Sequence, residues 1–246
     1  MSTPPTVVLV HGAFADASSY FPLYSELAGD DFAVIAPANP LRGVLIDAAY
    51  TRSVIDQIDG PVVLAGHSYG CAATTLAGMS EKVVGLVYIA GYALEEGESL
   101  AELQGRFPDS LLASNLKFAP FPVEGSEPGT DVTCDPEAFP EVVCADAPIE
   151  FARFLAASQR PLAASAFNDR ATEPAWKTKP CWGIIPTADH TINPDVHRFG
   201  FNRAKMPTLE IEGSSHLVIY SHPREVADVI RQAVSETGAG ISSAAA

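Results

Sequence analysis

The sequence is poor in basic residues. It has 15 Lys and Arg against 30 Asp and Glu, which gives the 246-residue chain a formal charge of −15 with histidine neutral. Nucleic acids are bound by clusters of Lys and Arg, and anionic membranes attract the same residues. We therefore expect neither a nucleic acid nor a membrane among the partners of this chain.

Cysteine is also scarce, and its spacing carries no signature of a metal site. The four cysteines are Cys71, Cys134, Cys144 and Cys181. They include no C-x-x-C pair and match no zinc-ligand spacing, so no metal site is predicted. A reduced, cytoplasmic compartment is the default for such a chain. In an exported protein, Cys134 and Cys144 lie close enough in sequence to form a disulfide within one segment.

Long hydrophobic runs are absent as well. The longest apolar stretch, Val83–Leu94, is interrupted by two glycines and is well short of the roughly 20 residues that a membrane-spanning helix needs. Met1–Pro5 contains no basic residue, and the apolar run that follows is only Val7–Val10. No signal peptide is predicted, and we expect a cytoplasmic protein.

Short apolar runs separated by helical patterns indicate an α/β fold with a mostly parallel, six-stranded sheet flanked by helices. The runs are nearly continuous rather than alternating, which is typical of strands that are covered on both faces. The predicted strands are Thr6–Val10, Phe32–Ala36, Pro61–Ala65, Val83–Ala90, Cys181–Pro186 and Thr208–Glu212. The predicted helices are Tyr20–Ala28, Leu45–Ile58, Cys71–Met79 and Pro223–Val234.

One long segment interrupts this pattern after the fourth strand. Residues 1–91 and 180–236 are expected to form the core, and residues 92–179 a lid inserted above the sheet. Within the lid, residues 118–148 look like a loop, whereas 148–158 and 160–167 look like short helices. The low-complexity tail at 237–246 is predicted to be disordered.

The pentapeptide Gly66-His67-Ser68-Tyr69-Gly70 stands between a predicted strand and a predicted helix. This is the context in which the G-x-S-x-G pattern forms a tight turn that exposes a nucleophilic serine. Side chains at the two glycine positions would clash in so sharp a turn. Ser68 is therefore the candidate nucleophile.

A serine nucleophile needs a base and an acid that orients the base. In the order Ser…Asp…His, the acid follows a late strand and the histidine follows the last one. These positions are occupied by Asp189 and His216. The rivals are His222, at a predicted helix start, and Asp195, further along the chain.

The loop after the first strand, His11-Gly12-Ala13-Phe14, is placed to form half of an oxyanion hole. Such a site combines a backbone N–H of this loop with the N–H of the residue after the nucleophile. We expect the donors to be Ala13 and Tyr69, with Phe14 as the second choice in the loop. His11 is interpreted as a structural residue that braces the loop.

These motifs together resemble the α/β-hydrolase superfamily, and its compact branch of plant methylesterases, hydroxynitrile lyases and small bacterial esterases in particular. The likeness extends over about residues 6–235 and is weakest in the lid. It implies an α/β-hydrolase fold with a mostly helical lid, no cofactor, a Ser68–His216–Asp189 triad, and the Ala13 and Tyr69 amides as oxyanion hole.

Two positions depart from the cyanohydrin-cleaving members of that branch, which carry threonine at the position of Gly12 and lysine at that of Leu217. Without the lysine, nothing obvious stabilises a departing cyanide. We also expect Gly12 to leave open space near the oxyanion amides for an ester carbonyl. The sequence thus favours hydrolysis over the lyase reaction.

The expected function is hydrolysis of a carboxylic ester of a small, mainly apolar molecule through an acyl-enzyme, without a cofactor. The alternatives are lactone, carbamate or amide hydrolysis or perhydrolysis by the same triad, and a ligand receptor of slow turnover. Aromatic residues of the lid could form either the pocket or the lid's own core. The predicted pocket residues are Phe14, Tyr92, Phe118, Phe121, Phe154, Leu155 and Leu217.

Overall fold

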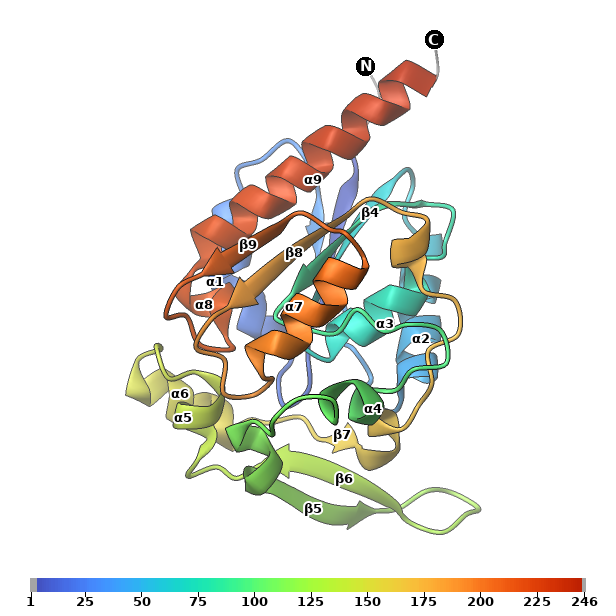
Figure 1. Ribbon diagram of the computed structural model, residues 1–246. Coiled ribbons are helices and arrows are strands. Elements are labelled where there is room, and N and C mark those ends of the chain that lie inside the picture. Colours follow the sequence, from blue (N-terminus) through green and yellow to red (C-terminus); the bar gives the residue numbers. More distant parts are fainter. Residues whose placement is uncertain (1–3, 245–246) are drawn as a thin grey trace.

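A six-stranded, fully parallel sheet forms the centre of the protein (Figure 1). The computed structural model describes residues 4–244, with side chains to residue 238. The strand order is β2-β1-β3-β4-β8-β9, and each predicted strand is present. Their bounds are β1 Thr6–Val10, β2 Val34–Ile35, β3 Val62–His67, β4 Val83–Ile89, β8 Cys181–Pro186 and β9 Thr208–Ile211.

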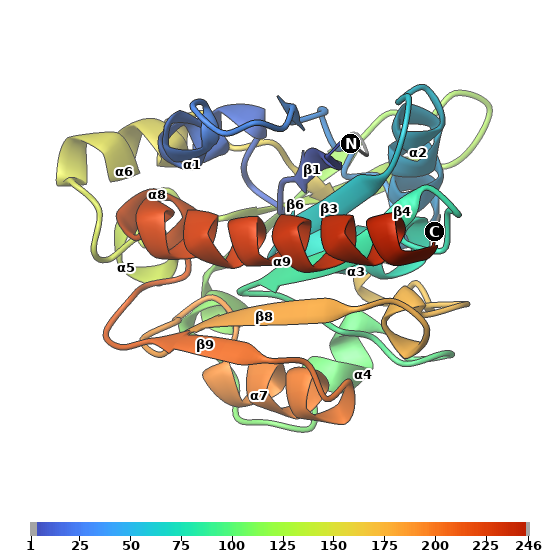
Figure 2. The same ribbon diagram turned by 90° about the horizontal axis from the view of Figure 1, so that it is seen from above.

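Helices cover both faces of this sheet (Figures 1 and 2). On one face α1 (Phe21–Leu27) and α8 (Val218–Ser221) pack with the long α9 (Pro223–Ala244). On the other lie α2 (Val44–Asp56), α3 (Gly70–Ala77) and α7 (Pro194–Arg203). Helix α9 continues through most of the tail predicted to be disordered, and residues 245–246 of that tail lie outside the described residues.

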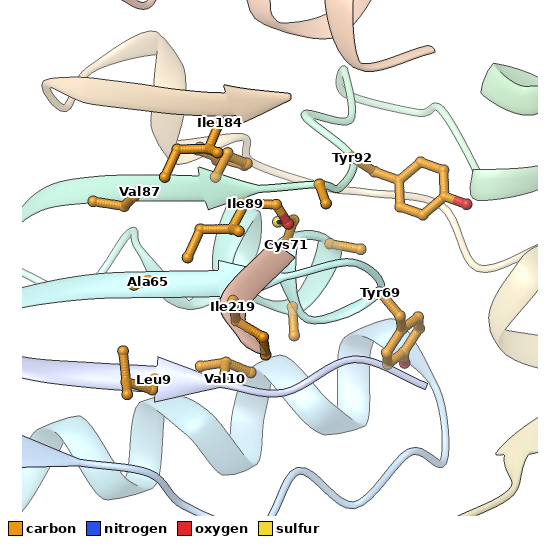
Figure 3. Close-up of a cluster of buried hydrophobic side chains, with 14 of the residues drawn as sticks. Leu9, Val10, Ala65, Tyr69, Cys71, Val87, Ile89, Tyr92, Ile184 and Ile219 are labelled. Carbon is orange, nitrogen blue, oxygen red and sulfur yellow. Dashed lines mark hydrogen bonds between the residues drawn. The ribbon is translucent and has the colours of Figure 1, made fainter. Parts of the chain in front are cut away.

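The strands are buried on both faces because helices shield both. Residues Val7–Val10 of β1 and Val62–Ala65 of β3 are inaccessible to solvent. Figure 3 shows side chains of β1, β3, β4 and β8 in one apolar cluster, with Ile219 of α8 against it. Tyr69 and Tyr92 lie beyond the carboxyl ends of β3 and β4 in the same view. The rigid core thus ends where the candidate catalytic loops begin.

The insertion between β4 and β8 lies across that end of the sheet, at the bottom of Figure 1. It contains a second, three-stranded sheet in the order β5-β6-β7, in which the neighbours are antiparallel. Its elements include α4 Leu100–Gln104, β5 Leu116–Phe121, β6 Gly129–Cys134, α5 Phe139–Val143, α6 Ile149–Ala157 and β7 Leu162–Ala163.

The loop predicted for residues 118–148 is therefore wrong, and the insertion is mixed rather than mostly helical. The hairpin of β5 and β6 escapes recognition because Pro120 interrupts one strand and most of β5 is exposed, which leaves no apolar alternation. The helix predicted at 148–158 is confirmed by α6. The one predicted at 160–167 is replaced by β7 and the single 3₁₀ turn Ala164–Phe167.

Candidate active site

Ser68 occupies a strained turn at the carboxyl end of β3. Its φ is +56°, in the left-handed region that non-glycine residues rarely adopt. The flanking glycines permit this turn, because a Cβ on Gly66 would lie 2.8 Å from the Cα of Cys71 and one on Gly70 would lie 2.2 Å from the carbonyl oxygen of Val10. The turn directs Ser68 into a pocket that His216 also lines.

The candidate base and acid are in direct contact. His216 Nδ1 lies 2.7 Å from Asp189 Oδ2, and both side chains are buried. Since the carboxylate accepts the Nδ1 proton, Nε2 of a neutral His216 is free to take a proton from Ser68. Within the described residues, Ser68 and His216 form no hydrogen bond with each other. Such catalytic hydrogen bonds are often long or poorly aligned in enzymes without bound substrate.

Asp189 is held as a carboxylate by its donors. Oδ1 accepts hydrogen bonds from the backbone amides of Thr191 (2.8 Å) and Ile192 (2.9 Å). Oδ2 accepts from His216 and lies 3.0 Å from Nε2 of His197. Burial alone would raise the pKa of Asp189, but the two histidines lower it below its ordinary value. Sequence reasoning gave no role to His197, because it lies eight residues after the acid with no motif around it.

The two expected oxyanion donors are available. Within the described residues, the N–H groups of Ala13 and Tyr69 donate to no other group, whereas that of Phe14 donates to the carbonyl of Arg160 at 3.1 Å. The second choice, Phe14, is therefore wrong as a donor. Its N–H is engaged by the insertion, although its side chain lines the pocket.

His11 orients the peptide group that carries the Ala13 N–H. Its Nε2 accepts the Asn39 amide at 2.9 Å, so Nδ1 carries the proton and donates to the carbonyl of Gly12, also at 2.9 Å. A trans peptide places the Gly12 carbonyl and the Ala13 N–H on opposite sides. Burial lowers the pKa of His11, which keeps this tautomer neutral. These contacts match the bracing role expected of His11.

Tyr69, the other donor, is anchored through its side chain. Its hydroxyl donates to Asp47 Oδ2 at 2.7 Å, and the other oxygen of Asp47 accepts the Arg42 amide at 3.0 Å. Burial raises the pKa of both Tyr69 and Asp47. Asp47 of α2 thereby restrains the residue that directly follows Ser68.

The open space expected at Gly12 is absent. A Cβ there would lie 2.7 Å from Cβ of Ser68 and 3.3 Å from its Oγ. The nucleophile itself occupies the space, because the loop after β1 crosses directly over the turn after β3. Glycine is required at position 12 for this close approach rather than for substrate.

Two adjoining apolar pockets meet at Ser68. Phe14 lines both, Tyr92 lines the first, and Leu155 and Leu217 line the second. The linings contain no Lys, Arg, Asp or Glu. Phe167, one of the lid aromatics expected to form either the pocket or the lid's own core, lines the first. Residues that sequence reasoning missed are Leu100, Leu112, Leu162, Thr191 and Ile192 in the first and Phe139 and Val143 in the second.

Three of the predicted pocket residues line neither pocket beside Ser68. Phe118 is 63% exposed on β5 and lines an outer groove, and Phe154 is 60% exposed on α6. Phe121 lies against the guanidinium of Arg42, at 4.8 Å from the ring centroid. Phe118 and Phe154 are thus largely exposed to solvent, whereas Phe121, on the opposite face of β5 from Phe118, is half-buried against Arg42.

Comparison with known proteins identifies the family. The family model described as "Alpha/beta hydrolase family" matches residues 7–229, nearly the whole chain. The chain is an α/β hydrolase. A search among curated proteins finds no significant match.

Solved structures share this α/β-hydrolase fold over almost their whole length. Polyneuridine aldehyde esterase is 18% identical with a TM-score of 0.80, and the match covers 93% of this chain and 98% of that one. Methylesterase MES16 from Arabidopsis is 20% identical with a TM-score of 0.75, covering 94% and 99%. A pyrethroid hydrolase from Sphingobium faniae JZ-2 is 18% identical with a TM-score of 0.73, covering 94% and 97%. The recognition of an α/β hydrolase like the plant methylesterases is confirmed.

The insertion of this α/β hydrolase is bonded to both catalytic loops. In the loop of the acid, Thr191 Oγ1 donates to the carbonyl of Val142 at 2.8 Å. In the loop of the base, the Leu217 amide donates to Val143 O at 3.0 Å and the Ser215 amide to Asp146 Oδ2 at 2.9 Å. Segment 142–146 of the insertion thus holds Asp189 and His216 in place.

The rival residues lie elsewhere in this α/β hydrolase. Asp195 is in the first turn of α7 and pairs with Arg198, and His222 ends α8 beside Glu225. Cys71, next to the turn that carries Ser68, is inaccessible to solvent, and burial raises the pKa of its thiol to about 12. All four cysteines are buried free thiols.

The described residues contain no group of three or more His, Cys, Asp or Glu side chains arranged to hold a metal ion. None of the helices described combines the length and the apolar character that crossing a membrane requires.

Proposed function

We propose that this protein is a serine hydrolase that cleaves a carboxylic ester through an acyl-enzyme. One observation carries the proposal. His216, which pairs with the buried Asp189 at 2.7 Å, lines the same pocket as a serine held at φ +56°. The names of similar structures, an esterase, a methylesterase and a pyrethroid hydrolase, agree with ester chemistry but are those proteins' own.

The reaction follows from these positions. His216 Nε2 takes the Ser68 proton as Oγ attacks the ester carbonyl, and Asp189 stabilises the imidazolium that forms. The Ala13 and Tyr69 N–H groups donate to the tetrahedral oxyanion. His216 returns the proton to the leaving alcohol, which leaves Ser68 acylated. Water, activated by the same histidine, then releases the acid and restores the serine.

The substrate we propose is an uncharged ester with an apolar group on each side of the carbonyl. Both pockets adjoin Ser68, and the described residues that line them are mainly apolar and include no Lys, Arg, Asp or Glu. Burying an unpaired charge there would cost several kcal/mol. Acyl and alcohol groups of a few carbons each are therefore favoured over charged ones.

A panel of p-nitrophenyl esters with acyl chains of increasing length tests the proposal. Ser68→Ala should lower the turnover by about three orders of magnitude or more, while Ser25→Ala, an exposed serine on α1, should leave it unchanged. A fluorophosphonate should add its mass to the wild type but not to Ser68→Ala. A single slow turnover, or hydrolysis that survives Ser68→Ala, would contradict the proposal.

The cyanohydrin-lyase alternative is tested with mandelonitrile. Leu217, which lines the second pocket beside His216, is 2% exposed and offers no charge to a departing cyanide. We expect no cyanide release above the uncatalysed rate. Release of cyanide faster than cleavage of any ester in the panel would replace the hydrolase proposal with a lyase.

A further inference from the structure

A second buried histidine contacts the acid of the proposed triad. His197, on α7, is inaccessible to solvent. Its Nε2 lies 3.0 Å from Asp189 Oδ2, and its Nδ1 lies 3.0 Å from the carbonyl oxygen of Gly91. Asp189 Oδ2 is thus shared by two imidazole rings, those of His197 and His216.

Both partners of His197 are hydrogen-bond acceptors. The Gly91 carbonyl can only accept, and so can an ionised Asp189. Asp189 stays ionised because Oδ1 is occupied by two backbone N–H donors and Oδ2 by His216 at 2.7 Å. A neutral imidazole has a single N–H and would turn a lone pair towards one acceptor. Only the imidazolium form donates to both.

The fold leaves His197 little freedom to avoid these contacts. Helix α7 begins at Pro194, where the Asn193 side chain accepts the Asp195 amide at 3.0 Å and caps the helix. One turn later the His197 ring stacks on Phe201, with a centroid distance of 6.1 Å. The ring is thereby fixed between the end of β4 and the loop of the acid.

We propose that His197 is a buried imidazolium that shares Asp189 with His216 and lowers the basicity of His216. This inference rests on the proposed function. The positive charge on His197 offsets the carboxylate that would otherwise stabilise a protonated His216. The base therefore stays neutral, and able to accept the serine proton, at a more acidic pH than a simple His–Asp pair would allow. His197 is a positioning residue, because it acts through Asp189.

The other titratable groups near His197 and His216 carry no charge that contacts either ring. The rings of His67 and His216 are 4.9 Å apart, and burial lowers the pKa of His67 to about 3, so it is neutral. Burial holds Tyr92 protonated by raising its pKa. Asp146 reaches the loop of the base through Ser214 and Ser215 and touches neither ring. Within the described residues, Asp189 is thus the single anion in contact with the His197 or the His216 ring.

Nitrogen NMR of the full chain tests the protonation state without any substrate. In Ser68→Ala, which should be inactive but folded, both ring nitrogens of His197 should carry protons at pH 7. Comparison with the spectrum of His197→Gln assigns the signals. A single protonated ring nitrogen on His197 at pH 7 would overturn the proposal. This NMR measurement does not depend on which reaction the protein catalyses.

The pH dependence of activity tests the consequence. Gln at 197 keeps an uncharged donor, so the acid limb of kcat/KM should move up by about one pH unit. A purely structural role would lower kcat/KM by the same factor at every pH. His222→Gln, a half-buried histidine beside Glu225 and outside the site, should leave the limb unmoved. An unmoved limb in a folded His197→Gln would also overturn the proposal, and if that variant does not fold, the NMR result on Ser68→Ala decides.

Discussion

Replacing Gly12 by alanine should misplace the nucleophile. The added Cβ would lie 2.7 Å from Cβ of Ser68 and 3.0 Å from the carbonyl oxygen of His67. Carbon atoms prefer separations of about 3.5 Å or more, so one of the two segments must retreat by about 0.8 Å. Ser68 cannot move freely, because its own N–H donates to the carbonyl of Ile89 at 2.9 Å.

The size of the effect follows from that displacement. A shift of about 1 Å in a catalytic group costs about 100-fold in rate, and crowding of this kind costs about 1–3 kcal/mol of stability. We expect kcat for p-nitrophenyl butyrate to fall about 100-fold while the variant remains folded. Initial rates and a thermal unfolding curve measure both quantities.

Gly29→Ala is the matched control. No heavy atom lies within 4 Å of a Cβ at Gly29, and the residue is exposed, so its kcat should equal that of the wild type. A Gly12→Ala protein with kcat within threefold of the wild type would refute the reasoning that the oxyanion loop crosses directly over Ser68.

The remaining predictions concern the acid, stability, thiols and the pocket. Asp189→Asn should lower kcat by about 10⁴-fold by favouring the wrong tautomer of His216, and initial ester hydrolysis rates measure this. Since His67 has an ordinary pKa of 6.5 when unfolded and about 3 when folded, the unfolded state binds more protons between these values. The free energy of unfolding should therefore fall as the pH drops below 6.5, by up to about 1.4 kcal/mol per pH unit from this residue. Urea titrations at pH 7.5, 6 and 5 measure that slope, which should be shallower in His67→Gln, and an equal slope in both proteins would contradict the assignment. The four buried thiols should resist Ellman's reagent in the native protein and all react in guanidinium, whereas two missing thiols in denaturant would indicate a disulfide. Tyr92→Phe should lower KM for alkyl esters by about two- to tenfold, because it removes a polar hydroxyl from a mainly apolar lining, and a raised KM would show that the hydroxyl binds substrate.

The predictable part of this molecule is the part built from local rules. Residues 62–65 form an apolar, buried strand, and the glycines after them permit one tight turn. The strand and the turn that carries Ser68 could therefore be recognised together. The positions of Asp189 and His216 followed from the order of strands, because loops at the carboxyl ends of parallel strands converge.

The parts that escaped recognition depend on long-range contacts. β5 and β6 pair with each other in a half-exposed sheet, where Pro120 and polar residues hide the strand pattern. His197 could not be singled out because its role arises only when α7 brings it to Gly91 and Asp189. The sequence pointed to Gly12, but the expected open space beside it was wrong, because the crossing of two loops cannot be seen in the sequence.

The bonds between segment 142–146 and the catalytic loops have a consequence for how this enzyme could acquire new specificities. The segment contains Val143 and follows Phe139, both of which line the second pocket, and it also supports the loops that carry Asp189 and His216. Transplanting the whole insertion from a relative would replace the scaffold of the catalytic loops together with the walls of the pocket. Divergence is therefore easier through single side-chain exchanges at positions such as Leu155, which lines the second pocket and has no backbone bond to either catalytic loop among the described residues. Such exchanges would reshape the cavity and leave the alignment of the reacting groups undisturbed.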